Sequence, residues 1–516
     1  MTTIERTPED MRSDILSEEQ LGHLRHFDNL SRNLPNDWSL MHGKAGGQDD
    51  FGSFRFQLAY MTYAMALTYR HRLPNAPGVF KPVFERLIDK MLLPEVWSYW
   101  HDTSRGGFIM NAHLSGEYRE QWNPVVKDNI MYSAYVQSMA LMYNYLFADD
   151  RYAEPGALTF DQWTFYWGGE GHRFEYDQNS LNETVYWQMV ESGYLGVACE
   201  PNCVFQICNQ PAILGFRMHD LLNGGSTAEE VTESYEKVWS ELGRLDQSGH
   251  YNMMVLEDSR TVIPTRPVSA WTDAWCGSLM NMWNSEYVHT HYASQIGDLV
   301  FDGPDGTMSV HPSPDPEAMG RVGRYDSCDF GWTTVWSSEM GDDKTLESLL
   351  RHADRFMMPT WRDGGLYYPR NDTATDSDGH RTEVEPMTGN VLLGYARLNV
   401  PDGLNKFYNE PWDASRHSEP SLVEVGGDVS VSQARFDSDT SVLHFRITRH
   451  EDRSGDGRVL ISNVPNDREW SLYEGDEQVA SASDGDVSAS RTDGGLAVVL
   501  RPGRPHALRL VLGAAR

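Results

Sequence analysis

The sequence is poor in cysteine and contains no long apolar run. Only 5 of the 516 residues are cysteines and none lies within the first 198, so a disulfide framework is excluded and a cytoplasmic location is expected. The first twenty residues lack the apolar stretch of a secretory signal. No segment reaches the roughly 18 apolar residues of a membrane span, so no stable membrane insertion is expected.

Basic residues are also scarce. The chain has 43 Lys and Arg, of which 7 are Lys, against 75 Asp and Glu, which gives a net charge of −32. Nucleic acid is therefore excluded as the main partner, because phosphate binding needs a basic face. The sequence has no Walker loop, no strand-anchored G-x-G-x-x-G, no H-E-x-x-H, no C-x-x-C and no acidic terpene-synthase motif, so none of the nucleotide, dinucleotide or metal sites that these motifs form is expected.

Apolar helical patterning, in contrast, is abundant. Six segments rich in aromatic and small residues cover roughly residues 54–69, 128–147, 202–222, 269–284, 329–340 and 385–398. More amphipathic, charged segments such as 82–91, 227–242 and 344–356 lie between them. Alternation of apolar and half-polar helices is what two concentric layers require. The pattern predicts a mainly α protein, with an (α/α)6 barrel as the catalytic domain over residues 1–412.

The composition changes near Trp412. Beyond this point, short β-prone runs at 429–434, 441–447, 458–461, 496–500 and 507–512 are separated by Asp, Gly and Ser turns. Such runs predict an antiparallel, β-sandwich-like C-terminal domain over residues 413–516. Because it contains no cysteine and no obvious cluster of catalytic groups, we expect a lid, stabilising or interface module.

The most specific stretch of the sequence is Ala198-Cys199-Glu200-Pro201-Asn202-Cys203-Val204-Phe205-Gln206-Ile207-Cys208-Asn209. Pro201 marks a helix start, which would place Cys203 and Cys208 in the first turns and Cys199 on the preceding loop. Two thiols would then face one cavity, and the helix N-terminus would favour thiolate. The alternative interpretation is three buried structural cysteines, since free cysteine is among the most buried residue types.

The Cys199-Glu200-Pro201 stretch, followed by Phe205 and Cys208-Asn209, resembles the signature of the linalool dehydratase/isomerase family. The stretch Lys127-Asp128-Asn129-Ile130-Met131-Tyr132 resembles another motif of that family, and the likeness covers roughly residues 20–400. The resemblance implies an (α/α)6 barrel, a ring-like homo-oligomer, and dehydration and isomerisation of terpene alcohols without metal or organic cofactor.

The resemblance also implies roles for individual residues. Cys199 and Cys208 match the two active-site cysteines, Asp28 matches the catalytic aspartate, and Met131 matches a pocket residue. The chain departs from the family in its polar groups: Tyr135 stands where the family has a histidine. Family tyrosines fall at Phe56, near Leu34 and at Trp271, and a family disulfide cysteine falls at Leu93.

Dehydration of an allylic alcohol needs a proton for the leaving oxygen, a base for a carbon-bound proton, and stabilisation of an allyl-cation-like state. A thiol can give or take a proton and can add transiently, so one of Cys199 and Cys208 would be the acid and the other the base or nucleophile. Asp28 would activate a thiol or the hydroxyl, and Tyr135 would replace the family histidine as donor. Aromatic side chains near the starts of inner helices would supply cation–π stabilisation in an apolar pocket: Phe56, Tyr132, Tyr135, Phe205, Trp271, Trp275 and Trp332.

Two other functions remain open at this stage. A terpenoid cyclase on the same scaffold would suit a pocket with fewer hydroxyl-binding groups. A glycosidase or polysaccharide lyase is the alternative by analogy of fold, with Asp50, Asp128, Asp273 and Asp329 as candidate carboxylates. The Cys-Glu-Pro stretch argues against a carbohydrate-active enzyme, because a glycosidase needs no thiol pair.

Overall fold

The structure is a computed structural model. It describes residues 15–44, 52–106, 111–114, 118–163, 170–265, 268–313, 327–479 and 485–515. Asp50, one of the candidate carboxylates, lies outside the described residues. The chain divides into two compact units, His26–Ala64 with Phe84–Pro411, and Met1–Arg25 with Met65–Val83 and Trp412–Arg516.

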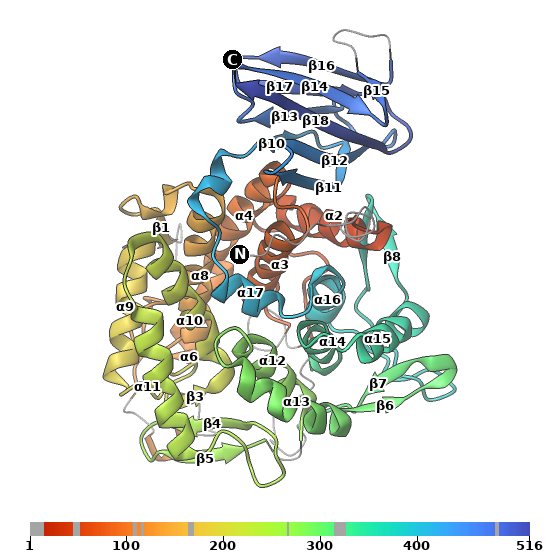
Figure 1. The fold of residues 1–516 in the computed structure, drawn as a ribbon. Coiled ribbons are helices and arrows are strands. Elements are labelled where there is room, and N and C mark those ends of the chain that lie inside the picture. The colour runs from red at the N-terminus through yellow and green to blue at the C-terminus, as the bar shows by residue number, and fades with distance from the viewer. Residues whose placement is uncertain are drawn as a thin grey trace. The chain divides into compact units, whose positions relative to one another are not determined.

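The apolar segments of the sequence form a set of inner helices in the larger unit (Figure 1). They are α3 (Phe54–His71), α8 (Ile130–Phe147), α10 (Gln206–Asn223), α12 (Ala270–Met280), α14 (Asp329–Glu339), and a π-helical turn η5 (Thr388–Leu392) continued by α16 (Leu393–Leu398). Of these, α3 continues beyond Ala64 into the smaller unit. Every residue of α12 and α14 is buried. These helices are therefore covered on all sides, as their apolar sequences require.

Consecutive inner helices pack against one another, α8 on α10, α10 on α12, α12 on α14 and α14 on α16. Their backbones approach closely where one side chain is missing. A Cβ at Gly215 of α10 would lie 2.4 Å from Gln137 of α8, and a Cβ at Gly277 of α12 would lie 2.5 Å from the Trp336 indole of α14. Glycine at these two positions permits the close contact.

The inner helices run in the same direction. In their first turns, Gln57 of α3 accepts a hydrogen bond from Asn390 of η5, and Asp329 of α14 accepts one from the Trp271 backbone of α12. At their last turns, Glu339 of α14 accepts a hydrogen bond from Asn281, which follows α12. The N-terminal ends of these helices therefore meet at one end of the unit and the C-terminal ends at the other.

More polar helices cover the inner ones. Helix α11 (Thr227–Leu242) buries Ala228, Val231, Tyr235 and Trp239, a stripe with the spacing of one helix face. Helix α9 (Gln178–Glu191) begins with a capping box in which Asp177 accepts hydrogen bonds from the Asn179 and Ser180 backbones. The remaining longer helices are α2 (Glu18–Arg32), α4 (Pro77–Met91), α13 (Ser285–Leu299), α15 (Asp343–Phe356) and α17 (Gly403–Asn409).

Short antiparallel hairpins connect the helices of this unit. They pair β1 (Leu158–Gln162) with β2 (His172–Tyr176), β6 (Val300–Asp302) with β7 (Met308–Val310), and β8 (Thr360–Arg362) with β9 (Gly365–Tyr367). A three-stranded sheet has the order β3-β4-β5, from β3 (Cys203–Phe205), β4 (Asn252–Leu256) and β5 (Thr261–Pro264). Single turns of helix lie at α5 (Pro94–Trp97), α6 (Trp100–Thr103), η1 (Ala112–Leu114), η2 (Arg151–Ala153) and η3 (Pro304–Gly306).

The strands of the C-terminal region form two antiparallel sheets in the smaller unit, after a helical turn η6 (Ala414–Ser418). One sheet has the order β10-β13-β17-β16, from β10 (Ser421–Val425), β13 (Arg458–Ser462), β17 (Gly495–Leu500) and β16 (Val487–Thr492). The other has the order β11-β12-β18-β14-β15, from β11 (Val429–Asp437), β12 (Val442–Arg449), β18 (His506–Ala515), β14 (Arg468–Glu474) and β15 (Glu477–Gln478). An α-rich chain with separate antiparallel sheets confirms the coarse fold class expected from the sequence.

None of the described helices is both long and apolar enough to cross a membrane.

Candidate active site

Cys199 and Cys208 lie side by side at the N-terminal end of α10. Cys208 is in the first turn of that helix, and Cys199 is on the loop before it, where its backbone N–H donates to the Cys203 carbonyl over 2.9 Å. The Cys199 thiol donates a hydrogen bond to the Cys208 sulfur. The Cys208 thiol lies 3.4 Å from the Met131 thioether of α8, which can only accept. The two thiols and Met131 thus form a buried row of three sulfur atoms.

Both thiols are neutral in this environment. The bond to Cys208 and burial raise the pKa of Cys199 well above its usual value, and burial raises the pKa of Cys208 despite the bond from Cys199. This differs from the expectation that the helix N-terminus would favour thiolate. Desolvation of a fully buried thiol outweighs the partial charge at a helix end.

Cys203 is not in a helix, and this part of the sequence prediction was wrong. Residues Cys203–Phe205 form strand β3, and their partners Leu256, Val255 and Met254 in β4 are about fifty residues away in the sequence. Helix α10 therefore begins at Gln206, and Asn202 adopts a left-handed backbone with φ of 70°. Pairing with a distant strand overrides the helix-start signal of Pro201.

An aromatic cluster lies at the same end of the unit. The Trp275 and Trp332 rings stack at 4.7 Å, and the Phe56 ring lies edge-on to Trp275 at 5.4 Å and to Tyr135 at 6.1 Å. At its centre is Tyr60, whose hydroxyl accepts hydrogen bonds from Trp275 Nε1 over 2.6 Å and from the Tyr135 hydroxyl over 3.0 Å. Sequence reasoning missed Tyr60, although its position one turn after Phe56 in α3 was available as a signal.

The structure gives Tyr135 a poor environment for proton donation. Burial raises the pKa of the Tyr135 phenol well above its usual value, and its hydroxyl proton is directed at Tyr60. Its assigned role as a catalytic donor stays a prediction.

The other expected pocket residues lie on the first turns of the inner helices or just before them. The Tyr132 hydroxyl donates to the Met91 carbonyl over 2.6 Å, and Trp271 is 7 % exposed with its backbone N–H bound to Asp329. Phe205 is half-buried at the end of β3.

Asp28 lies on α2 and is held by two arginines. Its Oδ1 accepts hydrogen bonds from Arg32 Nε over 2.9 Å and from Arg86 of α4 over 2.7 Å. The contacts described for Asp28 do not include the thiol pair, and its catalytic role stays a prediction.

Arg55 is a site residue that sequence reasoning did not find. It is 5 % exposed, and its guanidinium carbon lies 4.3 Å from the ring centres of both Phe56 and Tyr99. Its positive charge lowers the pKa of both Cys199 and Cys208, in opposition to burial. A cation held between aromatic rings thus faces the thiol pair, and the only sequence signal was a charged residue at the start of an apolar helix.

Two of the candidate carboxylates for a glycosidase already accept hydrogen bonds from neighbouring residues. Asp273 accepts hydrogen bonds from His250 Nδ1 over 2.5 Å and from the Tyr251 backbone over 2.8 Å. Asp329 accepts from the Trp271 backbone and from Ser313 through both its backbone and hydroxyl. Asp128, immediately before α8, is buried with 8 % of its surface exposed.

A separate cavity of about 300 Å³ opens beside the start of η5. It is lined by Leu40, His42, Tyr367, Pro369, Arg370 and Asn390. Behind it, His26 stacks on Tyr367 at 4.7 Å and bonds to Asn390 over 3.1 Å, and burial lowers its pKa to about 4. The Asn390 amide nitrogen donates to Leu40 and Gln57, so its oxygen faces His26 and the imidazole carries its proton on Nε2.

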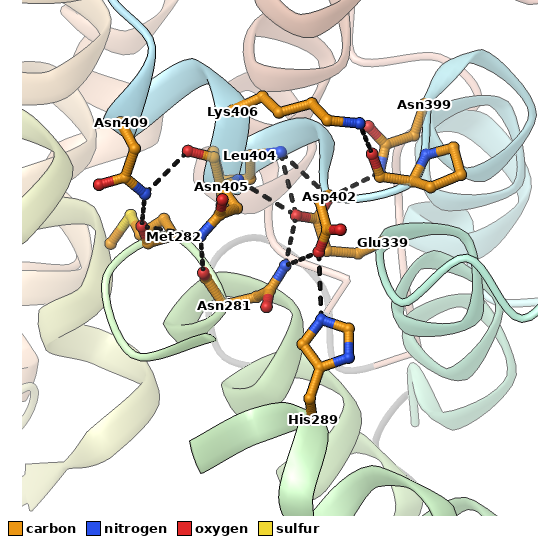
Figure 2. Close-up of polar contacts among 11 residues, drawn as sticks. Asn281, Met282, His289, Glu339, Asn399, Asp402, Leu404, Asn405, Lys406 and Asn409 are labelled. Atoms are coloured by element: carbon orange, nitrogen blue, oxygen red, sulfur yellow. Dashed lines mark hydrogen bonds and ion pairs between the residues drawn. The ribbon is translucent and has the colours of Figure 1, made fainter. Parts of the chain in front are cut away.

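The opposite end of the inner helices contains a buried polar network (Figure 2). Glu339, 1 % exposed, accepts hydrogen bonds from Asn281 over 2.9 Å and Asn399 over 2.8 Å. It also accepts from the Leu404 and Asn405 backbones of α17 over 3.0 and 3.3 Å. Glu339 therefore joins the ends of α12, α14 and α16 to the beginning of α17.

One exposed turn brings together groups that can bind a cation. Ligand atoms of Asp376, Asp378 and His380 lie within 4.8 Å of one another. Asp376 already accepts hydrogen bonds from the Asp378 and His380 backbones and from the His380 ring, so the arrangement is that of a self-bonded turn.

Several solved structures and one sequence family are similar to this chain. The solved structures similar to this chain include the GH76A α-1,6-mannanase from Salegentibacter sp. HEL1_6, with 13% identity, coverage of 73% of this chain and 98% of that chain, and a TM-score of 0.41. They also include a glycosyl hydrolase family 88 protein from Bacteroides vulgatus, with 12% identity, coverage of 75% and 98%, and a TM-score of 0.41. At these scores the likeness supports no inference about the substrate. A sequence model described as linalool dehydratase/isomerase matches residues 55–374, which is more than half of the chain and includes both thiols. The chain therefore belongs to the linalool dehydratase/isomerase family.

Proposed function

We propose that the chain is a cofactor-free lyase/isomerase that acts on an isoprenoid alcohol. The observation that carries the proposal is the hydrogen-bonded pair of neutral thiols, Cys199 and Cys208, buried at the end of the inner helices where the aromatic cluster also lies. Membership of the linalool dehydratase/isomerase family supports the same chemistry. We further propose that the inner and outer helices are the two layers of an (α/α)6 barrel.

Cys208 is the thiol that gives up its proton at lower cost. The Cys199 thiol already donates to the Cys208 sulfur, so a Cys208 thiolate would keep that hydrogen bond. The Arg55 charge favours a thiolate at either cysteine, so the hydrogen bond from Cys199 decides between them. Cys208 would protonate the hydroxyl of the substrate, the C–O bond would break to release water, and an allyl cation would remain beside the Cys208 thiolate. Return of water to the other allylic carbon, with one of its protons passing back to the Cys208 thiolate, gives isomerisation. Transfer of a carbon-bound proton to a base gives the diene.

The aromatic side chains would stabilise the cation. Ring faces attract a desolvated cation by about 2 kcal/mol or more, and they cannot capture it as water would. Because the hydroxyl of Tyr135 and the indole N–H of Trp275 are both bound to Tyr60, the cluster offers few free polar groups to the substrate. A mostly hydrocarbon substrate suits such surroundings.

The test is turnover of terpene alcohols under anaerobic conditions, with products identified by gas chromatography–mass spectrometry. The panel contains linalool, geraniol, nerolidol and geranyllinalool. We expect Cys208→Ala to lower kcat at least about 100-fold and Cys199→Ala to lower it less, because removal of an acid–base group typically costs that much. Cys276→Ala is the matched control, a buried cysteine in the body of α12, and should keep wild-type turnover. Equal turnover by wild type and Cys208→Ala would refute the proposal.

A terpenoid cyclase is the second candidate, favoured by the apolar Phe56 and Trp271 at positions where the family has tyrosines. Cyclic products from the same panel would support it, whereas acyclic dienes would support the dehydratase.

Two further proposals concern organisation. We propose that residues 1–412 carry the catalytic domain and residues 413–516 a β-sandwich-like domain, and that the protein is a homo-oligomer. Light scattering on the intact chain tests the oligomer.

A further inference from the structure

Three consecutive residues before α8 have left-handed backbones. Lys127, Asp128 and Asn129 have φ of 48°, 68° and 63°. Non-glycine residues adopt this conformation singly and uncommonly, so a run of three needs outside support. Asn129 supplies part of that support, because its side chain donates to the Pro124 carbonyl over 2.8 Å and accepts from the Tyr99 hydroxyl over 2.6 Å. Strained backbone that the surroundings hold in place is concentrated at functional sites.

The strained segment places Asp128 in unusual surroundings. Asp128 is 8 % exposed, yet its carboxylate has no hydrogen-bond or ion-pair partner in the described part of the chain. Buried carboxylates are normally paired, as Asp273 and Asp329 are in this chain. Asp128 has lost most of its contact with water without gaining a bond to any described residue, and this arrangement costs the fold stability.

Asp128 lies next to the thiol site. Two residues further on, the Ile130 N–H donates to the Ala198 carbonyl over 3.3 Å, so this segment runs beside the residue that precedes Cys199. Three residues further on, Met131 contacts the Cys208 sulfur. The Asp128 carboxylate also acts electrostatically on the Cys203 thiol, whose backbone carbonyl binds the Cys199 N–H.

The charged and titratable groups around Asp128 come from several elements. Lys127 is its chain neighbour, Glu257 follows β4, and Tyr118 and Cys203 also interact with it electrostatically. Burial and Glu257 raise the pKa of Asp128 to about 6, in opposition to Lys127. Near neutral pH the carboxylate is therefore ionised while the thiols are neutral, a combination of base and acid in one site.

We propose that Asp128 is the catalytic base of the dehydration, accepting the carbon-bound proton of the allyl cation. The inference rests on the proposed function. The C–H bond breaks, its electron pair forms the second double bond of the diene, and the proton passes to the Asp128 carboxylate. The Cys208 thiolate left after water departs then recovers a proton from Asp128, which restores both groups. No oxidant or cofactor takes part.

Asp128 suits this step better than Asp28 does. The Asp28 carboxylate is held by the guanidinium groups of Arg32 and Arg86, and proton uptake would disrupt both ion pairs. Among the described residues, Asp128 has no hydrogen bond that proton uptake would break.

The first test is the pH profile of diene formation by wild type, Asp128→Asn and Asp128→Glu. Wild type should show a limb near pH 6, with the rate rising as Asp128 ionises. Asp128→Asn should lose that limb and at least about 100-fold in rate at pH 8, more than it loses in allylic transposition, because only the diene needs the base. Asp128→Glu should recover part of the rate. The melting temperature of Asp128→Asn should equal or exceed that of wild type, which a merely structural role would not allow.

Two neighbouring substitutions serve as matched controls that leave the carboxyl in place. Lys127→Gln should move the limb to higher pH and Glu257→Gln should move it to lower pH, both with the plateau rate kept. A rate of Asp128→Asn within threefold of wild type, or a limb that neither neighbour moves, would overturn the role of Asp128 alone. Absence of terpene-alcohol turnover by wild type would overturn the proposed function, and this inference with it.

Discussion

Loss of the Glu339 carboxylate should lower the free energy of unfolding and leave kcat unchanged. Four donors point at this buried side chain: two amide groups, Asn281 and Asn399, and two backbone N–H groups at the start of α17. Glu339→Ala would remove this acceptor from all four, and the two amide groups would keep only weaker bonds to Asp402 and Ser338. A hydrogen bond to a charged group contributes about 1.5–3 kcal/mol, partly offset here because burial of the charge itself costs free energy. We expect the free energy of unfolding to fall by about 4 kcal/mol.

The free-energy cost of burying the Glu339 charge also shows in its pKa. Burial raises that pKa above its usual value in spite of the four hydrogen bonds. A carboxyl group whose pKa is raised in the folded protein lowers the stability of the fold as the pH rises through that pKa. Ionised Glu339 therefore binds its donors at a net cost in desolvation. Glu339→Gln keeps one acceptor oxygen without the charge, and we expect about half the loss of Glu339→Ala.

Urea unfolding at pH 7.5, followed by tryptophan fluorescence and circular dichroism, measures these losses. Glu347→Ala, an exposed glutamate on α15, is the matched control and should change stability by less than about 0.5 kcal/mol. Because Glu339 lies at the C-terminal end of α14 and the thiols lie at the N-terminal end of α10, the folded fraction of Glu339→Ala should keep its kcat. A loss below about 1 kcal/mol would refute the view that this network holds the four helices together.

Three further predictions follow from buried polar groups. The bond to Asp273 raises the pKa of His250, so the stability that this pair contributes is complete below about pH 6.5 and is lost as the pH rises through the raised pKa. The difference in melting temperature between wild type and Asp273→Asn should therefore shrink between pH 6 and pH 9. The pKa of Asp128 is raised from 3.8 to about 6, so ionisation costs about 3 kcal/mol at pH 8; Asp128→Asn should recover up to that amount in urea unfolding at pH 8 and almost none at pH 4. Tyr60→Phe removes the acceptor of Trp275 and Tyr135 and should cost about 2–3 kcal/mol in urea unfolding, whereas a loss below about 0.5 kcal/mol would show that neither bond matters.

The helices of the larger unit were predictable because burial on all sides leaves a strong sequence signal. The expected segment 329–340 differs from α14 (Asp329–Glu339) by one residue, and 344–356 differs from α15 (Asp343–Phe356) by one. The segment 202–222 was wrong at its start, because β3 exists only through its pairing with β4. A strand of three residues has too little sequence of its own to reveal a partner fifty residues away.

The thiol pair could be found from the sequence, but its protonation state could not. Spacing placed Cys199 and Cys208 at a helix start, where the dipole alone favours thiolate by well under about 2 kcal/mol. Burial opposes this and raises the pKa of both thiols, and burial depends on the side chains that surround the site in three dimensions, such as Met131 from α8. The effect of the helix dipole on the thiol pKa follows from local sequence, whereas the effect of burial depends on the whole fold. A local sequence pattern therefore predicts only the dipole effect, which is the weaker of the two.

The same reasoning explains why Asp128 was overlooked as part of the thiol site. Asp and Asn are the non-glycine residues that tolerate left-handed backbone best, so Asp128-Asn129 carried a weak signal for the turn. Nothing in the local sequence indicates that the carboxylate is buried without a partner among the described residues, because its burial depends on the loop around Cys203 and on Glu257. A carboxylate that destabilises the fold, on a backbone that is itself strained, is expected where selection acts on chemistry instead of stability. Asp128→Asn tests whether this residue serves chemistry and not stability, because the variant should be more stable and also react more slowly.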